Sequence, residues 1–271
     1  MNCKELRVKI LEEVKKYPEV FGMRDLIIIH VGDRYASSVY MRNKVKTCAE
    51  VGIKAEIYNF PSESKETDII NAVYTLNQID TVGGIIIQLP LPKHMNESKI
   101  LNSISPEKDL DCITNYRIGD FYSGSLNRLM PCTVSGIHQY IISNEISGRK
   151  AVVIGRSNVV GRPCAHMLET LNYTVTLCHS KTEDLASITK EADLIVCAVG
   201  KKNFLTLDMI KEGATIIDVG INRDEDGKVC GDVDKAVAQK ATLTPVPGGV
   251  GTLTTAMVAY NMMILDLERR G

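Results

Sequence analysis

The sequence predicts an α/β protein built as two lobes with mostly parallel sheets. Short apolar runs alternate with amphipathic stretches along the 271 residues, as expected when strands and helices alternate. In the second half, one apolar run leads through a glycine-containing turn into a helical pattern. The hydrophobic fraction is 44% and the charged fraction 24%, which is typical of a globular protein with a sizeable core.

In the first half, the pattern begins with an amphipathic helix over residues 1–16. This stretch is charged throughout, which argues against a secretory signal. Apolar runs that are too short for helices predict strands, and periodic stretches between them predict the connecting helices. The predicted strands cover 26–31, 55–60 and 84–89, and the predicted helices cover 37–50 and 65–78.

The second half repeats this alternation. Strands are predicted over 151–154, 174–178, 194–199 and 215–219, with a further short strand near Leu243. A long helix is predicted over 252–270, with Met257, Tyr260, Asn261 and Ile264 on one side. The polar stretch 115–128, which contains Gly119 and Gly124, is the predicted boundary between the lobes.

Composition excludes several classes of function. A formal net charge of -1 provides no strong field to recruit nucleic acid or an anionic membrane. The sequence has no run of about 18 uncharged apolar residues for a membrane span. Tryptophan is absent and aromatic residues are few, which argues against a stacking platform for single strands. Eight scattered cysteines without a C-x-x-C pair indicate reduced thiols and a cytoplasmic protein, and they offer no metal-ligand cluster.

The segment 150–163, KAVVIGRSNVVGRP, predicts a strand, a turn at Gly155 and a helix. Such a turn lets backbone N–H groups and the helix N-terminus approach a pyrophosphate, as in the Rossmann fold. Ser157 stands where the second glycine of G-x-G-x-x-G is expected. On this pattern alone, a turn that binds no ligand remains the alternative.

The end of the next strand distinguishes between cofactors. NAD enzymes usually carry an acidic residue there that binds the ribose 2′-hydroxyl, whereas this chain has His179-Ser180-Lys181 after Cys178. Arg156, Ser180 and Lys181 are therefore candidates to bind the 2′-phosphate of NADP. The alternative is a solvated basic turn, with Glu183 and Asp184 close by.

The first half contains a candidate chemical site. Tyr40 and Lys44 are four residues apart and share a helix face beside an apolar stripe, where partial burial would make the amine useful as a base or donor. Gln88 lies at the carboxyl end of a strand, where open α/β sheets bind ligands. Asp109 or Asp111 could bind an amino-pyrimidine edge. Each feature also has an ordinary interpretation: a surface pair, a strand-end amide and solvated loop carboxylates.

Together these segments resemble the bifunctional methylenetetrahydrofolate dehydrogenase/methenyltetrahydrofolate cyclohydrolase family across essentially the whole chain. The resemblance rests on seven motifs in order, which are SSVYMRNKVK (37–46), GIIIQLPLP (84–92), KDLD (108–111), VIGRSNVVGRP (153–163), CHSKT (178–182), DVGIN (218–222) and TPVPGGVG (244–251).

The resemblance implies oxidation of 5,10-methylenetetrahydrofolate with NADP and then hydrolysis to 10-formyltetrahydrofolate, a step of one-carbon metabolism. It implies a folate-binding catalytic domain over 1–118, completed by the helix 252–271, and an NADP-binding domain over 119–251. It also implies a homodimer. By the same resemblance the site residues are Lys44 as the central catalytic group, tuned by Tyr40 and Gln88; Asp111 as the pterin anchor; Pro247 and Gly248 in the folate cleft; Gly155, Arg156, Ser157 and Ser180 at the cofactor; and Ile221 near the nicotinamide.

The sequence departs from the family pattern beside this site. The family usually has Gly-Phe-His-Pro after the aspartate, and this chain has Cys112-Ile-Thr-Asn115. Arg117 replaces a common Asn, and Thr252 replaces a common Pro. These changes leave open a dehydrogenase without cyclohydrolase. Two further alternatives are an NADP-dependent dehydrogenase for a small organic acid and a non-catalytic nucleotide-binding subunit.

Overall fold

The computed structural model describes residues 1–17, 22–32, 35–124, 129–146 and 148–270. The chain forms two compact units, and each is discontinuous in sequence. The first unit comprises Lys9–Cys132 with Thr255–Gly271, and the second comprises Met1–Val8 with Thr133–Thr254. Two helices, α1 (Cys3–Lys16) and α9 (Val250–Arg270), contribute residues to both units.

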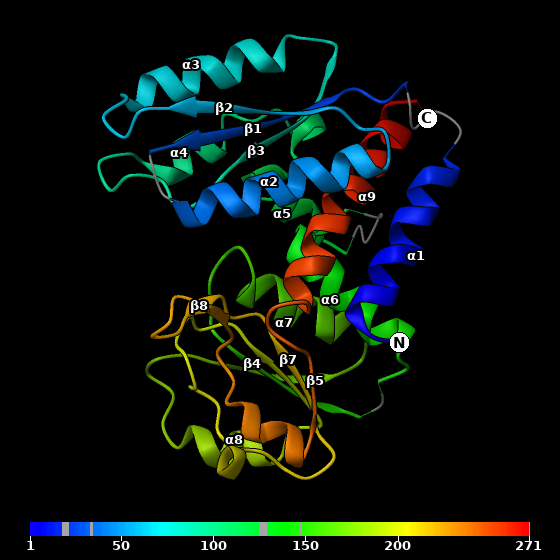
Figure 1. Cartoon of the computed structure of the whole chain (residues 1–271), viewed down its shortest axis with the longest axis vertical. Helices are drawn as coiled ribbons and strands as arrows, with labels where there is room; N and C mark the ends of the chain where they lie inside the picture. Colours follow the sequence, from blue (N-terminus) through cyan, green and yellow to red (C-terminus); the bar gives the residue numbers. More distant parts are fainter. Residues whose placement is uncertain (18–21, 33–34, 125–128, 147, 271) are drawn as a thin grey trace. The chain divides into compact units, whose positions relative to one another are not determined.

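The first unit contains a three-stranded parallel sheet in the order β2-β1-β3, shown at the top of Figure 1. The central strand β1 (Asp25–Val31) pairs with β2 (Ala55–Phe60) and β3 (Val82–Ile87). Every residue of β3 is buried, as in a parallel sheet covered on both faces. Helices α2 (Tyr35–Glu50) and α3 (Glu66–Asn77) connect the strands.

Short helices follow β3, and they lead to the long helix α9. They are α4 (Glu97–Leu101), the 3₁₀ turn η2 (Pro106–Lys108) and α5 (Asn115–Tyr122). Gly84 allows α9 to approach the sheet, because a Cβ atom there would overlap the side chains of Met262 and Leu110. By length and composition, α9 is the one helix among the described residues that could cross a membrane. However, 78% of its apolar window is buried, as in a core helix.

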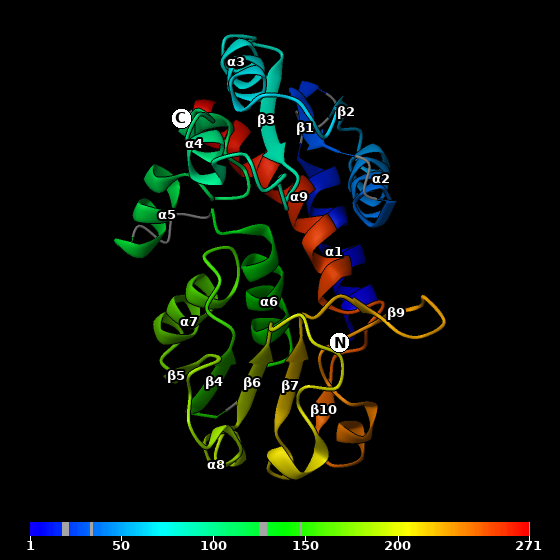
Figure 2. The same ribbon diagram turned by 90° about the vertical axis from the view of Figure 1, so that its left-hand side faces the viewer.

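The second unit contains a five-stranded parallel sheet in the order β10-β7-β6-β4-β5, whose strands are seen next to one another in Figure 2. Its strands are β4 (Lys150–Ile154), β5 (Thr174–Cys178), β6 (Leu194–Cys197), β7 (Thr215–Asp218) and β10 (Thr242–Leu243). The chain runs from β4 to β5 on one side and then to β6 on the other. The strand order therefore reverses at β4, which is where doubly wound sheets bind ligands.

Helices and one hairpin complete the second unit. The helices are α6 (Cys132–Ser143), α7 (Gly161–Thr170) and α8 (Leu185–Lys190), with 3₁₀ turns η3 (Leu207–Met209) and η4 (Lys235–Gln239). The antiparallel hairpin joins β8 (Asn222–Arg223) and β9 (Val229–Cys230).

The predicted α/β class and the parallel sheets are confirmed, and every predicted strand and helix is present within a few residues. The polar stretch 115–128, the predicted boundary between the lobes, contains the helix α5 in its described part. Thr114 begins this helix by accepting the Arg117 N–H at 3.2 Å, a local cap that outweighs the polar composition. The compact units divide at Cys132/Thr133, whereas the predicted boundary at residue 118 lies within α5.

One carboxylate joins the amino ends of the strands in the second unit. Asp193, just before β6, accepts the backbone N–H groups of Arg149 and Lys150 at 2.8 and 3.0 Å and pairs with Lys211. These donors lower the pKa of Asp193 from 3.8 to about 2. The folded state therefore gains stability from the ionised carboxylate above pH 3.8, and this gain disappears as the pH falls toward 2.

Asp193→Asn should lower the free energy of unfolding at pH 7 by about 1–2 kcal/mol, since part of the shift is screened by solvent. The difference from the unsubstituted protein should shrink as the pH falls below 3.8. Urea unfolding followed by circular dichroism between pH 7 and pH 3 measures this. A difference that stays constant with pH would show that the carboxylate charge is not responsible.

Candidate active site

Lys44 lies on α2 and is 5% exposed. Its Nζ donates a hydrogen bond to Gln88 Oε1 at 3.2 Å and lies 5.8 Å from the centre of the Tyr40 ring. Among the described residues, no carboxylate forms an ion pair with this amine. The fold therefore brings the predicted trio of Tyr40, Lys44 and Gln88 together. The two groups beside the Lys44 amine, the Gln88 amide and the Tyr40 ring, carry no charge.

Gln88 follows β3 directly, at the carboxyl end of the sheet. Its backbone N–H donates to Ile29 O at 2.8 Å, which continues the strand pairing for one more residue. Its side-chain Nε2 donates to Leu89 O at 2.9 Å. With the amide nitrogen held in this way, the amide oxygen is available to accept the Lys44 proton. This arrangement fixes the position of the Lys44 Nζ atom.

The two aspartates of KDLD have different environments. Asp109 is fully buried, and its carboxylate accepts the N–H groups of Ile113 at 3.0 Å and Thr114 at 2.7 Å. Burial raises the pKa of Asp109. Asp111 is half-buried, and its Oδ1 accepts the Cys132 N–H at 3.1 Å. Asp109 is thus committed to the backbone and is not a solvated loop carboxylate, which leaves Asp111 as the candidate for a ligand.

Asn261 supports the Asp111 segment, a contribution that the sequence analysis did not identify. This fully buried residue of α9 donates from Nδ2 to Leu110 O at 2.7 Å and to Met130 O at 2.9 Å. The Leu110 carbonyl group directly precedes Asp111, and the Met130 carbonyl group lies two residues before Cys132. Asp111 and Cys132 share the hydrogen bond described above. The only signal in the sequence was a polar residue on the apolar side of the predicted last helix.

In the second unit, the predicted turn after β4 has the geometry that a pyrophosphate requires. Gly155 has φ of +117°, and a Cβ atom there would overlap Ala198 O. Gly161 begins α7, and a Cβ atom there would overlap Gly155 O. Neither position therefore accommodates a side chain without rearrangement, and the backbone of the turn stays close to the start of the helix.

The remaining cofactor candidates surround this turn. Arg156, Ser180 and Lys181 are exposed, and the first follows β4 while the other two follow the paired strand β5. Ser157 accepts the N–H groups of Val160 and Gly161 at 3.2 and 3.3 Å. This hydroxyl thus accepts hydrogen bonds from two N–H groups at the start of α7.

Asp184 is one of the two acidic residues beside this turn that argued against a phosphate site in the sequence. In the structure it is the N-cap of α8. It accepts the Ser187 hydroxyl at 2.5 Å and the Ser187 N–H at 3.4 Å. A carboxylate held in this way is a poor partner for a ribose hydroxyl, which favours the interpretation of this turn as a phosphate site.

Two buried aspartates hold the loops beyond β6 and β7, and the sequence analysis missed this role for both. Asp232 accepts the N–H groups of Val199, Gly200 and Lys201 at 2.6–2.9 Å, and also the Asn222 side chain at 2.8 Å. Asp218 accepts the N–H groups of Gly220, Asp232 and Val233 at 2.9–3.0 Å, and burial raises its pKa. Ile221 follows in the same loop and is 56% exposed.

Pro247 and Gly248 lie in the turn before α9. Pro247 is exposed, and Gly248 has φ of +97°. Gly249 is tightly packed, since a Cβ atom there would overlap Pro245 O. The glycines therefore form a compact turn in the second unit. Among the described residues, no group of three or more His, Cys, Asp or Glu side chains is arranged to hold a metal ion.

Two family models match the chain. Residues 1–111 match the catalytic domain of tetrahydrofolate dehydrogenase/cyclohydrolase, and residues 131–269 match its NAD(P)-binding domain. The chain belongs to the tetrahydrofolate dehydrogenase/cyclohydrolase family. This assignment confirms the family that the seven motifs predicted.

Relatives and solved structures agree with this family. A bifunctional protein FolD from Campylobacter hominis is 47% identical, over 96% of this chain and 94% of that protein. The crystal structure of the bifunctional enzyme FolD from Campylobacter jejuni has a TM-score of 0.94 at 42% identity, over 99% of this chain and 98% of that one. The Trypanosoma brucei enzyme, complexed with NADP cofactor and inhibitor, has a TM-score of 0.90 at 33% identity, over 99% and 96%.

The departure from the family pattern after Asp111 has a local structural basis. Cys112 occupies the position of the usual glycine and keeps a positive φ of +54°. Its buried thiol contacts Arg117 O at 3.3 Å. Arg117 in turn donates from Nε to Pro106 O at 2.7 Å and pairs with Glu268 at 2.8 Å. The altered residues thus support one another, and Asp111 keeps its hydrogen bond to Cys132.

Asp232→Asn should destabilise the protein by about 3 kcal/mol and raise the KM for NADP, because an amide cannot accept all four bonds. Urea unfolding and steady-state kinetics measure the two effects. Asp226→Asn in the exposed β8–β9 hairpin is the matched control, and it should change neither quantity. Normal stability of Asp232→Asn would contradict the role assigned to these hydrogen bonds.

Proposed function

We propose that this chain oxidises 5,10-methylenetetrahydrofolate to the methenyl form with NADP and hydrolyses the product to 10-formyltetrahydrofolate. The observation that carries this proposal is the Lys44–Gln88 hydrogen bond beside Tyr40, in a chain whose family models cover both domains. Relatives at 41–47% identity are named bifunctional. The rival interpretation as an organic-acid dehydrogenase would leave these residues unexplained.

The residues around Gly155 suit NADP. Gly155 and Gly161 carry no side chain that would block a pyrophosphate, and the two exposed cations Arg156 and Lys181 follow neighbouring strands. Arg156 presents several N–H donors in a plane, which matches a 2′-phosphate. Ser180 adds a hydroxyl, and Ile221 offers an apolar surface for the nicotinamide. The NADP bound in the Trypanosoma brucei structure supports the same cofactor.

In the dehydrogenase step, bound NADP would supply the acceptor for the hydride that leaves the one-carbon bridge of the folate. No proton has to be removed, so the task of the chain is to align the ligands. Asp111 is proposed to hold the amino-pyrimidine edge of the pterin, with Oδ1 fixed by the Cys132 N–H and the preceding carbonyl fixed by Asn261. Pro247 and Gly248 are proposed to line the folate site.

In the cyclohydrolase step, water adds to the methenyl carbon, loses a proton and the ring opens. Lys44 is proposed to accept this proton at Nζ. Its burial and its hydrogen bond to Gln88 support this role, since they hold the amine at one position in the site. Gln88 and Tyr40 are proposed to position the amine.

The same proposal includes a cytoplasmic homodimer. Support for a reducing compartment comes from the eight cysteines, all of them free thiols and seven of them buried. The edge strand β5, with two of its five residues exposed, offers backbone groups that a second copy could pair with.

Lys44→Met should lower cyclohydrolase activity by a factor of about 100 or more while hydride transfer changes much less. Decay of methenyltetrahydrofolate absorbance and reduction of NADP measure the two activities. Lys46→Met, an exposed lysine on the same helix, is the control and should retain both. Equal loss of both activities with folate binding intact would exclude a specific hydrolytic role for Lys44.

Arg156→Gln should lower kcat/KM for NADP by about tenfold or more and leave kcat/KM for NAD nearly unchanged, because only NADP carries the 2′-phosphate. The measurement compares cofactor reduction with 5,10-methylenetetrahydrofolate in parallel reactions, so NAD is the internal control. Proportional losses with both cofactors would indicate that Arg156 acts elsewhere. Absence of reduction by a folded, unsubstituted protein would overturn the dehydrogenase itself.

A further inference from the structure

A pocket of about 760 Å³ lies in the first unit, at the edge of the sheet away from Lys44. Arg24 precedes β1, and Asp80 and Val82 lie at the start of β3, so the pocket is at the amino ends of these parallel strands. Gln88 lies beyond the carboxyl end of β3, about 20 Å along a six-residue strand. The pocket is therefore separate from the proposed chemistry.

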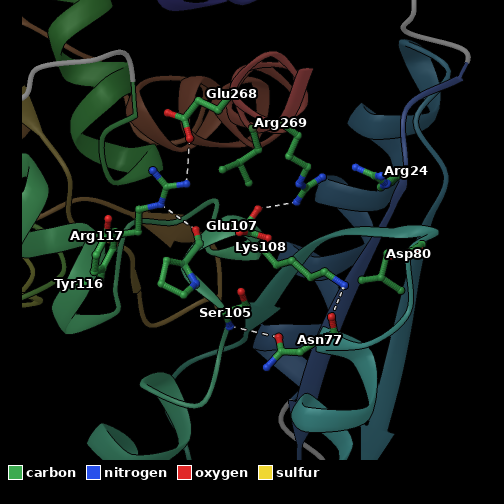
Figure 3. Close-up of a pocket in the computed structure, with 13 residues that line it drawn as sticks. Arg24, Asn77, Asp80, Ser105, Glu107, Lys108, Tyr116, Arg117, Glu268 and Arg269 are labelled. Atoms are coloured by element: carbon green, nitrogen blue, oxygen red, sulfur yellow. Dashed lines mark hydrogen bonds and ion pairs between the residues drawn. The ribbon is translucent and has the colours of Figure 1, made fainter. Parts of the chain in front are cut away.

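Three cations occupy one side of this pocket. Figure 3 shows Arg24, Lys108 and Arg269 on that side, with Tyr116 and Arg117 on the other. Lys108 Nζ donates to the carbonyl groups of Leu76, Asn77 and Ile79 at 2.8–2.9 Å, at the end of α3. Arg269 donates to the carbonyl oxygens of Gly83 and Glu107. These carbonyl partners hold the cations in place and do not neutralise them.

The local charge is incompletely compensated. Arg24 has no hydrogen bond or ion pair in the part of the chain that the structure describes, and neither Lys108 nor Arg269 pairs there with a carboxylate. Burial first, and then the neighbouring arginines, lower the pKa of Lys108 and that of Arg269. Of the three lining carboxylates, Glu268 pairs with Arg117, while Asp80 and Glu107 are exposed, so solvent screens much of their charge.

A glycine keeps the two arginines close to each other. A Cβ atom at Gly83 would lie 2.6 Å from Arg24 Cβ and 3.3 Å from Arg269 Nη1. The missing side chain thus leaves room for the base of the Arg24 side chain and for the Arg269 guanidinium beside one strand. Two arginines beside a lysine are the donor set that binds oxyanions, through several charge-assisted hydrogen bonds.

We propose that this pocket is a binding site for a small multivalent oxyanion, a phosphate or carboxylate compound. Arg24 supplies the uncommitted guanidinium, while Arg269 and Lys108 supply charge from fixed positions. The volume is that of a small-molecule site and exceeds what a single phosphate needs. Tyr116, 66% exposed, provides a flat surface for the rest of such a ligand.

Calorimetric titration of the full chain tests this proposal, with pyrophosphate and citrate as separate probes. Saturating NADP is present, so that the turn at Gly155 does not bind the probe. We expect saturable binding of at least one probe to the unsubstituted protein, and binding at least about tenfold weaker to Arg24→Gln. Arg149→Gln makes the same charge change in the second unit and should bind within about twofold of the unsubstituted protein.

The outcomes separate clearly. Binding of pyrophosphate alone assigns the site to phosphate compounds, and binding of citrate alone assigns it to polycarboxylates, provided that either depends on Arg24. The proposal is overturned if neither probe binds at about 10 mM, or if Arg24→Gln binds as tightly as the unsubstituted protein. Thermal unfolding checks that Arg24→Gln is folded, and a bound probe should raise the melting temperature of the unsubstituted protein but not that of this variant.

Discussion

Loops beyond the carboxyl ends of parallel strands contain backbone N–H groups that have no carbonyl partner in the sheet. In both units, buried carboxylates accept hydrogen bonds from such N–H groups. Asp232 and Asp218 accept six N–H groups, four of them after β6 and β7 and two after β9, and Asp109 accepts two before α5. An unpaired N–H group in these positions would cost about 1–3 kcal/mol. The loops that carry Ile221 and Asp111 therefore have one defined conformation.

The parts of the fold that could be predicted are those that a local sequence pattern encodes. Strands such as β1 and β3 are continuous apolar runs, and their burial on both faces follows directly from that pattern. The cap at Thr114 was harder to recognise, because the residues that follow it are polar and contain glycine. The helix α5 depends on Arg117 bridging to Pro106 and Glu268, and no local pattern encodes contacts over such sequence distances.

The candidate site shows a similar division. The spacing of Tyr40 and Lys44 placed them on one helix face, and the position of Gln88 after a buried run placed it at the strand end. The 3.2 Å hydrogen bond between Lys44 and Gln88 requires the packing of α2 against the sheet, which only the structure shows. The residue pattern alone did not distinguish Asp109 from Asp111, and only the family resemblance selected Asp111. In the structure they differ because only Asp109 faces the N–H groups of Ile113 and Thr114. Asn261 gave no recognisable motif, since its partners are carbonyl groups remote in sequence.

Cys112 illustrates how a departure from the family pattern can leave the chemistry in place. A left-handed backbone costs a non-glycine residue about 1–2 kcal/mol, which explains why glycine is usual there. Here burial of the thiol and its contact with Arg117 O offset part of that cost, and Arg117 anchors the segment to Pro106 and Glu268. Asp111 forms its bond to Cys132 in this conformation, next to the pterin site that we propose. The altered residues therefore bear on the stability of this segment, while Lys44 and Gln88, on which the hydrolysis would depend, lie on other elements.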